Sequence, residues 1–315
     1  MNIVFFIDQF SERGTEVAIY DYAKYNEEIL KNKSYIVCYS HVEVRTSYEK
    51  FKARFEILEI AHMREMKEII RDKSIHYFYV LTHGGHGDKR HSFSDRTIWG
   101  NCKTIKHCVF DTTSPDGDHY ITISNHLNQK YNTSLPVIPH IVERPVCTEN
   151  LRKELNLGDA TVFGRYGGFG DFNIKVVHQA IIKHLETPNV YFLFMNTKPF
   201  YTHPRIIYLD MNLDFTYKEK FINTCDAMIH ARVAGETFGL SIAEFSIRNK
   251  PIITCASGDL EHLRLLGKKA VLYDSGKSLL EIFENIKEII PLNDWTRYQE
   301  YSPENVMSQF KLLFK

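Results

Sequence analysis

The sequence has no apolar run long enough to cross a lipid bilayer and no excess charge of either sign. No segment approaches the roughly 18 apolar residues of a membrane-spanning helix, so we expect no transmembrane segment. Lysine and arginine total 39, as do aspartate and glutamate, which gives a formal net charge of zero. A neutral chain lacks the broad positive field that attracts nucleic acid. We therefore expect no nucleic-acid partner, while a peripheral membrane contact stays open.

Paired cysteines and a secretory leader are also missing. The six cysteines are scattered, without the close pairs of a zinc site or a disulfide framework. Separated thiols are typical of a reducing compartment. The first ten residues, MNIVFFIDQF, have neither the basic flank nor the small-residue cleavage site of a signal peptide. The sequence therefore predicts a cytoplasmic protein.

The glycine fingerprint of a dinucleotide enzyme is absent as well. Nicotinamide-dependent oxidoreductases carry G-x-G-x-x-G directly after a first strand. Residues 8–18, DQFSERGTEVA, contain a single glycine, Gly14. This pattern disfavours an oxidoreductase of that class.

Short β-rich runs alternating with helical stretches dominate the 315 residues. Such alternation is typical of α/β units built around parallel sheets. In a first series, we predict strands at 2–8, 35–40, 55–60, 77–83, 107–111, 120–124 and 135–140, with helices at 16–29, 48–52 and 64–71. In a second series, we predict strands at 160–168, 190–197, 205–210, 227–231, 251–255 and 269–274, a helix at 173–184 and a terminal helix at 303–314.

Each series has the size of one doubly wound domain. We predict an α/β protein with two Rossmann-like domains, residues 1–145 and 146–300, and a terminal helix, 301–315, which could pack back on the first domain. Two such domains would face a central cleft. Ligands of open α/β sheets bind outside the carboxyl ends of the strands, so these ends are the expected site.

Residues 231–254, ARVAGETFGLSIAEFSIRNKPIIT, place two glutamates around a predicted helix start. Glu236 precedes the helix, which should begin near Gly239. The helix should end at RNKP, because asparagine suits a left-handed C-terminal position and proline cannot continue a helix. Free N–H groups at Gly239 and Leu240 would favour an anion such as a phosphate.

The second glutamate, Glu244, shares a helical stripe with Leu240 and Ile247. A carboxylate on an apolar stripe needs partners, and the vicinal hydroxyls of a ribose are suitable ones. Two interpretations stay open from the residues alone. Either the segment binds a nucleotide sugar, or Glu236 simply favours the helix dipole while Glu244 pairs with Arg248 four residues later.

The segment resembles the E-x7-E signature of retaining GT-B glycosyltransferases, in particular glycosyltransferase family 4. That signature reads approximately E-G-F-G-x-x-x-x-E before a G-x-P-V strand, and this chain has ETFGLSIAE before NKPI. VFGRYGG at 162–168 resembles the G-R strand end of the family's second domain. VIPHIVE at 137–143 and CASGDLEHL at 255–263 resemble two further family segments, so the likeness spans most of the chain.

The resemblance implies a role for each matching residue. The first glutamate, Glu236, would contact the donor sugar, and the second, Glu244, would bind the ribose. Arg165 would neutralise the diphosphate. The donor-binding turn would comprise Thr237, Phe238, Gly239 and Leu240. In the first domain, the Gly14 turn is similar to a glycine loop beside the donor phosphates and acceptor, although a plain strand-to-helix turn is the alternative.

One position departs from the family pattern. A lysine usually stands five residues after the arginine, and this chain has Gly170 there. Lys175, Arg232 or Lys250 could compensate, and we include Arg232 among the donor-binding candidates. The second phosphate contact is therefore in question.

The loop LTHGGHGDKRH at 81–91 contains further polar candidates. His83 could orient an acceptor or take part in catalysis. Four residues of this loop are of types that bind metals: His83, His86, Asp88 and His91. A solvated loop without a metal has the same composition. The resemblance implies an enzyme without a catalytic metal, so we predict none.

We accordingly predict a retaining glycosyltransferase that needs no cofactor, with Glu236, Arg165 and His83 as catalytic candidates. It would move a hexose-like sugar from a nucleoside diphosphate, UDP or GDP, to a hydroxyl of a glycan, lipid or small molecule. The alternative is a non-catalytic GT-B subunit that binds a nucleotide sugar or a protein partner.

Overall fold

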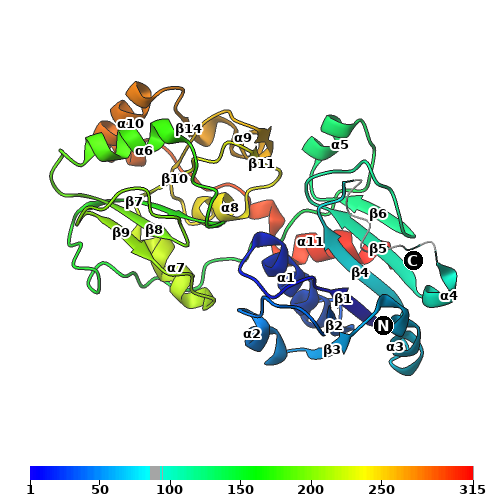
Figure 1. The fold of residues 1–315 in the computed structure, drawn as a ribbon. Helices are drawn as coiled ribbons and strands as arrows, with labels where there is room; N and C mark the ends of the chain where they lie inside the picture. The colour runs from blue at the N-terminus through cyan, green and yellow to red at the C-terminus, as the bar shows by residue number, and fades with distance from the viewer. Residues whose placement is uncertain (86–92, 94, 315) are drawn as a thin grey trace. The chain divides into compact units, whose positions relative to one another are not determined.

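The computed structural model describes residues 1–85, 93 and 95–314 (Figure 1). The chain forms two compact units. Unit 1 comprises Met1–Ile141 and Tyr301–Lys315, and unit 2 comprises Val142–Glu300. Within the described ranges, no helix is long and apolar enough to cross a membrane.

Unit 1 is built on a parallel six-stranded sheet with strand order β3-β2-β1-β4-β5-β6 (Figure 1). The strands are β1 Asn2–Phe6, β2 Lys33–Tyr39, β3 Glu56–Ile60, β4 Tyr77–Thr82, β5 Lys103–Cys108 and β6 His119–Thr122. Its helices are α1 Gly14–Glu28, α2 Tyr48–Lys52, α3 Met66–Asp72, α4 Arg96–Trp99, α5 Asn125–Tyr131 and α11 Pro303–Phe310. The central strand β4 is buried along its whole length, as expected for an apolar run inside a parallel sheet.

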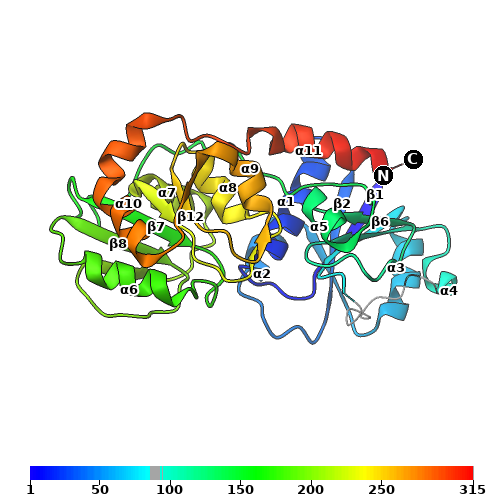
Figure 2. The same cartoon turned by 90° about the horizontal axis from the view of Figure 1, so that it is seen from above.

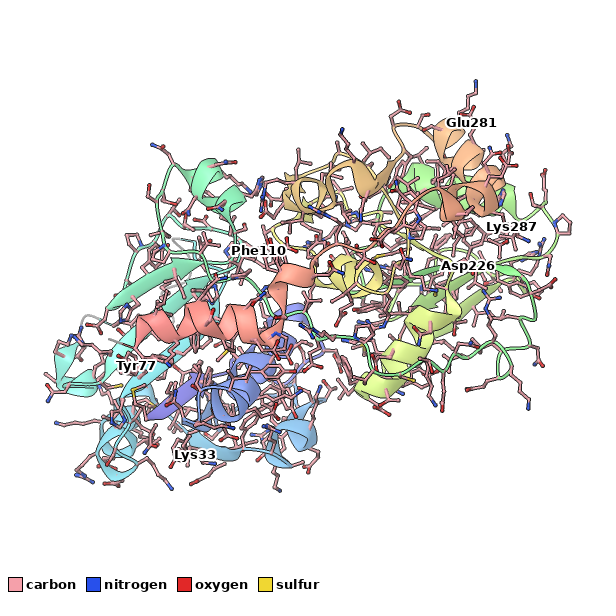
Figure 3. All side chains as sticks on the ribbon, turned by 180° about the vertical axis from the view of Figure 1, so that it is seen from behind. Lys33, Tyr77, Phe110, Asp226, Glu281 and Lys287 are labelled. Carbon is pink, nitrogen blue, oxygen red and sulfur yellow. The ribbon has the colours of Figure 1, made fainter. Side chains whose placement is uncertain are left out.

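The C-terminal helix α11 packs on unit 1 through aromatic rings. Phe310 lies 5.0 Å from Tyr22 on α1 and 5.5 Å from Tyr79 on β4, measured between ring centroids. Phe314 lies 4.8 Å from Tyr77, which Figure 3 places beside this helix. Aromatic pairs at these separations add stability beyond the area that they bury.

Two predicted strands of unit 1 differ from the structure. Residues 135–140 form a single bridge, between Thr122 and Val137, because Pro136 and Pro139 have no N–H to donate to a ladder. The strand expected at 107–111 instead runs over 103–108. Its polar Lys106 is buried because its Nζ reaches the carbonyl of Ser114 at 2.8 Å.

Unit 2 repeats this plan with strand order β14-β12-β10-β7-β8-β9, again all parallel. The strands are β7 Thr161–Tyr166, β8 Val190–Met195, β9 Ile206–Leu209, β10 Ala227–Ile229, β12 Ile252–Thr254 and β14 Ala270–Leu272, and a small second sheet pairs β11 Gly235–Glu236 with β13 Asp259–Leu260. The helices are α6 Lys175–His184, α7 Phe215–Thr224, α8 Leu240–Ser246, α9 Glu261–Leu266 and α10 Gly276–Ile289. The two parallel sheets confirm the predicted α/β class.

Helices α6 and α10 lie side by side and cover one face of the unit 2 sheet (Figure 2). Phe163 and Phe192 from the sheet meet Phe283 from α10 at ring centroid distances of 4.7 and 5.6 Å. Burial of these large apolar side chains stabilises the sheet whose carboxyl ends carry the polar residues of the site.

The strand order reverses direction between β7 and β10. After β7 the chain moves outward to β8 and β9, and α7 then returns it to β10, which pairs with β7 on its other side. The loops that leave the carboxyl ends of β7 and β10 therefore depart in opposite directions. Such a switch point is the usual ligand site of an open α/β sheet.

Candidate functional site

The loop after β7 is organised by Arg165. Its guanidinium is buried, with 5% of the residue exposed. It donates to the carbonyls of Gly168 at 2.8 Å and Asn196 at 3.2 Å, and to the Thr197 hydroxyl at 2.6 Å. Burial lowers the pKa of Arg165 to about 10, which still leaves the group charged at neutral pH. The loop thus holds a fixed positive charge close to the carboxyl end of the sheet.

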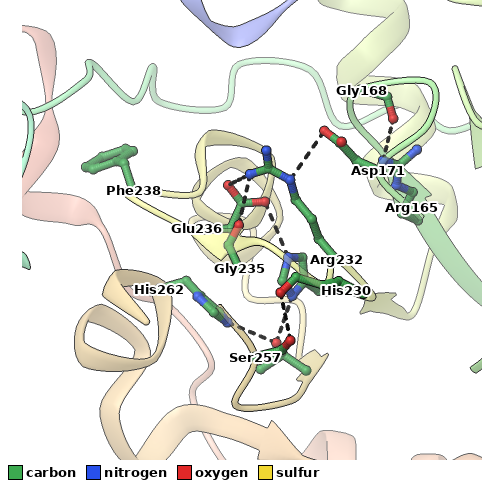
Figure 4. A network of polar contacts seen from close by, with 12 residues as sticks. Arg165, Gly168, Asp171, His230, Arg232, Gly235, Glu236, Phe238, Ser257 and His262 are labelled. Carbon is green, nitrogen blue, oxygen red and sulfur yellow. Dashed lines mark hydrogen bonds and ion pairs between the residues drawn. The ribbon is translucent and has the colours of Figure 1, made fainter. Parts of the chain in front are cut away.

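Glu236 lies on the neighbouring loop, held from both sides (Figure 4). His230 Nε2 lies 3.3 Å from Oε1 of Glu236, and Arg232 Nη1 donates to Oε2 at 3.2 Å. Arg232 also forms an ion pair with Asp171 on the loop after β7, at 3.5 Å. Arg232 therefore joins the two loops of the switch point through their carboxylates.

The charge on Glu236 is maintained despite its surroundings. Burial acts to raise the pKa of this carboxyl, but the hydrogen bond with His230 and the positive charge of Arg232 outweigh burial and hold the pKa below its usual range. The side chain is 18% exposed. Glu236 is consequently an ionised, accessible acceptor with a fixed orientation.

Gly235 is required for this placement. Its φ is +64°, and a Cβ there would lie 2.2 Å from the backbone oxygens of Ser257 and Asp259. The backbones of β11 and β13 approach so closely because this residue has no side chain. Ser257 also donates to the Val233 carbonyl at 2.8 Å, which ties the two loops together.

Behind Glu236, a row of buried polar side chains leads into the interior. His230 Nδ1 lies 2.9 Å from the Thr254 hydroxyl, and that hydroxyl lies 3.1 Å from His262 Nε2. Both Thr254 and His262 are completely buried. Burial and the neighbouring His230 lower the pKa of His262 to about 3, so it is neutral at physiological pH.

Glu244 has a different partner from the one that the helical spacing suggests. Its carboxylate pairs with Lys218 on α7, while the Arg248 side chain pairs with Glu219 and donates to the backbone carbonyl of Glu244. The suggested Glu244–Arg248 carboxylate pair is therefore wrong. Lys218 lies 5.8 Å above the ring of Tyr166, the last residue of β7. Glu244 thus belongs to the same end of the sheet as Arg165, in the second half of α8.

The turn before α8 is shaped by the sequence as expected. Gly239 adopts a left-handed conformation, with φ of +83°, and the helix begins at Leu240. Phe238 is fixed from behind, because its carbonyl accepts from the Tyr298 hydroxyl at 3.1 Å. Thr237 beside it is buried. No side chain in the described part of the chain caps the first N–H groups of α8.

The other end of α8 also confirms a prediction. Asn249 has the expected left-handed backbone, with φ of +57°. The helix itself ends at Ser246, a few residues before the predicted stop.

Gly170 and its suggested substitutes differ sharply in position. No described heavy atom lies within 4 Å of a Cβ added at Gly170. Lys175 is exposed at the start of α6. Lys250 is half-buried, desolvation lowers its pKa, and its charged neighbours include Asp226, the residue before β10. Of the three substitutes, the structure places only Arg232 against Glu236.

In unit 1, Gly14 is the first residue of α1. It is exposed, and its backbone is not left-handed. His83 follows β4 and is exposed, with its ring 5.3 Å from that of Phe110. His86, Asp88 and His91 lie outside the described residues. Within those ranges, no group of three histidine, cysteine, aspartate or glutamate side chains is arranged to hold a metal ion.

Several residues of this site were not anticipated from the sequence. None of the five was singled out from the sequence, and they come from separate parts of unit 2: His230, Thr254, His262, Asp171 and Lys218. The one available signal was a histidine at the end of an apolar strand, six residues before Glu236. A buried histidine in that position needs hydrogen-bond partners.

No protein-family model matches the sequence. A comparison with curated proteins also finds no match. Solved structures do match. HepE from Anabaena, in complex with UDP and glucose, aligns with a TM-score of 0.76 and 14% identity over 100% of this chain and 99% of that one.

Two further structures give the same result. A glycosyltransferase from Rickettsia africae aligns with a TM-score of 0.69 and 15% identity over 98% of this chain and 94% of that one. Sucrose-phosphate synthase from Thermosynechococcus elongatus aligns with a TM-score of 0.66 and 11% identity, over 100% and 95%. At these identities the likeness concerns the fold, and the chain has the GT-B fold.

Proposed function

We propose that the chain is a glycosyltransferase that moves a sugar from a nucleoside diphosphate to an acceptor hydroxyl, with retention of anomeric configuration. The observation that carries the proposal is the Glu236 site. An ionised carboxylate is fixed beside two arginines at the carboxyl ends of β7 and β10, on a GT-B fold. A donor sugar and its diphosphate need these two kinds of group next to each other.

Glu236 would hold the donor sugar. Each of its oxygens already accepts one hydrogen bond, from His230 or Arg232, and each keeps a further lone pair for a sugar hydroxyl. Arg165 and Arg232 would offset the negative charge that grows on the departing diphosphate. The N–H groups at Gly239 and Leu240 would contribute in the same direction.

Glu244 would bind the ribose. A carboxylate can accept two vicinal hydroxyls, and Lys218 would share it rather than block it, because carboxylate oxygens have about four acceptor sites. The acceptor hydroxyl would attack the sugar from the side that the diphosphate leaves, hydrogen-bonded to that diphosphate. This route needs no protein nucleophile and includes no metal.

We assign the donor to unit 2 and the acceptor to unit 1, with His83 on the acceptor side and Gly14 among the donor-binding residues. UDP is the favoured nucleotide because HepE, of the same fold, was solved in complex with UDP-glucose, and GDP is the alternative. The acceptor is a glycan, a lipid or a small molecule. The six free thiols favour the cytoplasm.

A second function is favoured by one specific feature. The two arginines, Arg165 and Arg232, lie near two carboxylates, Asp171 and Glu236, so these four charges sum to zero. With Gly170 in place of a lysine, the phosphate site has little net attraction for a diphosphate. A non-catalytic subunit, which binds a nucleotide sugar but does not have to stabilise a departing diphosphate, would tolerate this charge balance.

The test compares binding with turnover. A thermal-shift panel of UDP, GDP, ADP and CMP with their sugar conjugates identifies the nucleotide, because a ligand at a hundred times its dissociation constant stabilises by about 2.7 kcal/mol. Donor hydrolysis and transfer are then measured with the conjugate that binds. Turnover with a retained anomer supports the enzyme. Binding without turnover favours the subunit, and no shift with any nucleotide contradicts both.

A further inference from the structure

The buried side chains behind Glu236 form one continuous hydrogen-bonded row that crosses four elements. His230 follows β10, Thr254 ends β12, His262 lies on α9 and Glu236 ends β11. The spacings along the row are 3.1, 2.9 and 3.3 Å, from His262 to Glu236. Burying three polar side chains is costly unless each is hydrogen-bonded.

The chemistry of the row fixes where each hydrogen lies. An ionised carboxylate can only accept, so His230 must donate its Nε2–H to Glu236. In a neutral imidazole the other nitrogen, Nδ1, is then an acceptor, and it takes the hydroxyl hydrogen of Thr254. The Thr254 oxygen in turn accepts from Nε2–H of His262. Every hydrogen in the row therefore points toward Glu236.

We infer that Thr254 and His262 are positioning residues, which hold His230 in its Nε2–H tautomer and thereby fix the Glu236 carboxylate for the donor sugar. Without the Thr254 hydroxyl, His230 can carry its hydrogen on Nδ1 instead. Its Nε2 lone pair would then face a carboxylate oxygen across 3.3 Å, and the carboxylate would lose one of its two supports. The inference rests on the proposed function for its effect on turnover but not for the tautomer itself.

Three variants separate positioning from general stability. Thr254→Val removes the hydroxyl and keeps the shape, and Thr254→Ser restores the hydroxyl. Thr224→Val is the matched control, because Thr224 is another fully buried threonine of unit 2 whose hydroxyl makes two hydrogen bonds, with Leu151 and Lys220. All three are compared with the wild-type protein at pH 8, where imidazole is ordinarily neutral.

Two measurements test the inference. Nitrogen-15 NMR of histidine-labelled protein reports the tautomer of His230, assigned by its loss in His230→Gln. We expect the Nε2–H form in the wild-type protein, in Thr254→Ser and in Thr224→Val, and a mixture in Thr254→Val. In donor turnover, Thr254→Val should lower kcat about 3- to 10-fold, the effect of one neutral hydrogen bond, with the affinity for UDP unchanged and Thr254→Ser restoring the rate.

The outcomes that overturn the inference are specific. An unchanged tautomer in Thr254→Val, or a doubly protonated His230 in the wild-type protein, contradicts it. So does a kcat loss that Thr224→Val reproduces, because that loss would reflect general loosening. If the wild-type protein turns over no donor, the proposed function fails, while the NMR comparison still decides the tautomer.

Discussion

Replacing Gly170 by lysine should tighten the binding of a nucleoside diphosphate. Gly170 lies on the loop after β7, next to Asp171, which pairs with Arg232. No described atom obstructs a side chain there, and the backbone is not left-handed, so we expect a change in folding stability within about 0.5 kcal/mol. The substitution would change the local charge sum from zero to plus one.

The size of the effect follows from the position of the loop. Two unit charges 4 Å apart interact by about 1 kcal/mol in water and about 4 kcal/mol near a protein surface. The loop at Gly170 is exposed, and ordering a lysine side chain costs entropy, so the net gain should lie near the lower value. About 1 kcal/mol corresponds to roughly fivefold tighter binding.

Titration calorimetry with UDP at two salt concentrations measures this gain. The control is Asn285→Lys, which adds the same charge on the exposed surface of α10. We expect tighter binding only in Gly170→Lys, with the gain reduced at high salt because exposed charges are screened. Equal affinities for the wild-type protein and Gly170→Lys, or an equal gain in Asn285→Lys, would refute the placement of the diphosphate beside this loop.

Three further predictions concern other parts of the molecule. Lys218→Met should remove the ion-pair partner of the buried Glu244 carboxylate and destabilise unit 2 by about 3 kcal/mol, which calorimetry measures. Glu244→Gln should weaken UDP binding at unchanged kcat. A UDP affinity unaffected by Glu244→Gln argues against the ribose contact. Gly235→Ala should lower donor turnover more than 10-fold, because a Cβ cannot fit against the Asp259 backbone; full activity in this variant would mean that Glu236 needs no such placement. Acid should destabilise unit 1, because burial lowers the pKa of His107 to about 3, so that the folded protein keeps it neutral at a pH where the unfolded chain binds a proton. The stability present above about pH 6.5 should fall by about 2 kcal/mol at pH 5. A melting temperature of unit 1 that is equal at pH 7 and pH 5 would contradict this prediction.

The fold was predictable from sequence because its strands are short apolar runs with regular helical spacers. The GT-B fold follows from a resemblance whose segments span most of the chain, and the left-handed backbone at Asn249 follows from the adjacent residues alone. Two strand predictions were wrong, one because of a contact outside the predicted run and one because of prolines inside it. Lys106 stays in a buried strand because Ser114 accepts from it, and Pro136 and Pro139 break a run that is otherwise apolar.

The residues of the candidate site also fall into two groups, those identifiable from a local segment and those brought in by other elements. Glu236 and Gly239 could be identified from one short segment, because the helix start and the glutamate spacing are local. The side chains that hold Glu236 could not, since His262 and Thr254 reach it through His230 from other elements. Lys218 was missed for a similar reason. It meets Glu244 because α7 and α8 pack together, which no spacing along the chain reveals.

Turnover of UDP-sugars by Glu236→Gln, compared with the wild-type protein in the same assay, tests whether Glu236 holds the donor sugar. The amide keeps the shape of the side chain but removes its charge. We expect UDP to bind both proteins with equal affinity. The variant should lose at least 10-fold in the release of UDP from the donor, because Glu236 holds the sugar rather than the nucleotide. Equal rates of UDP release by the two proteins would contradict it.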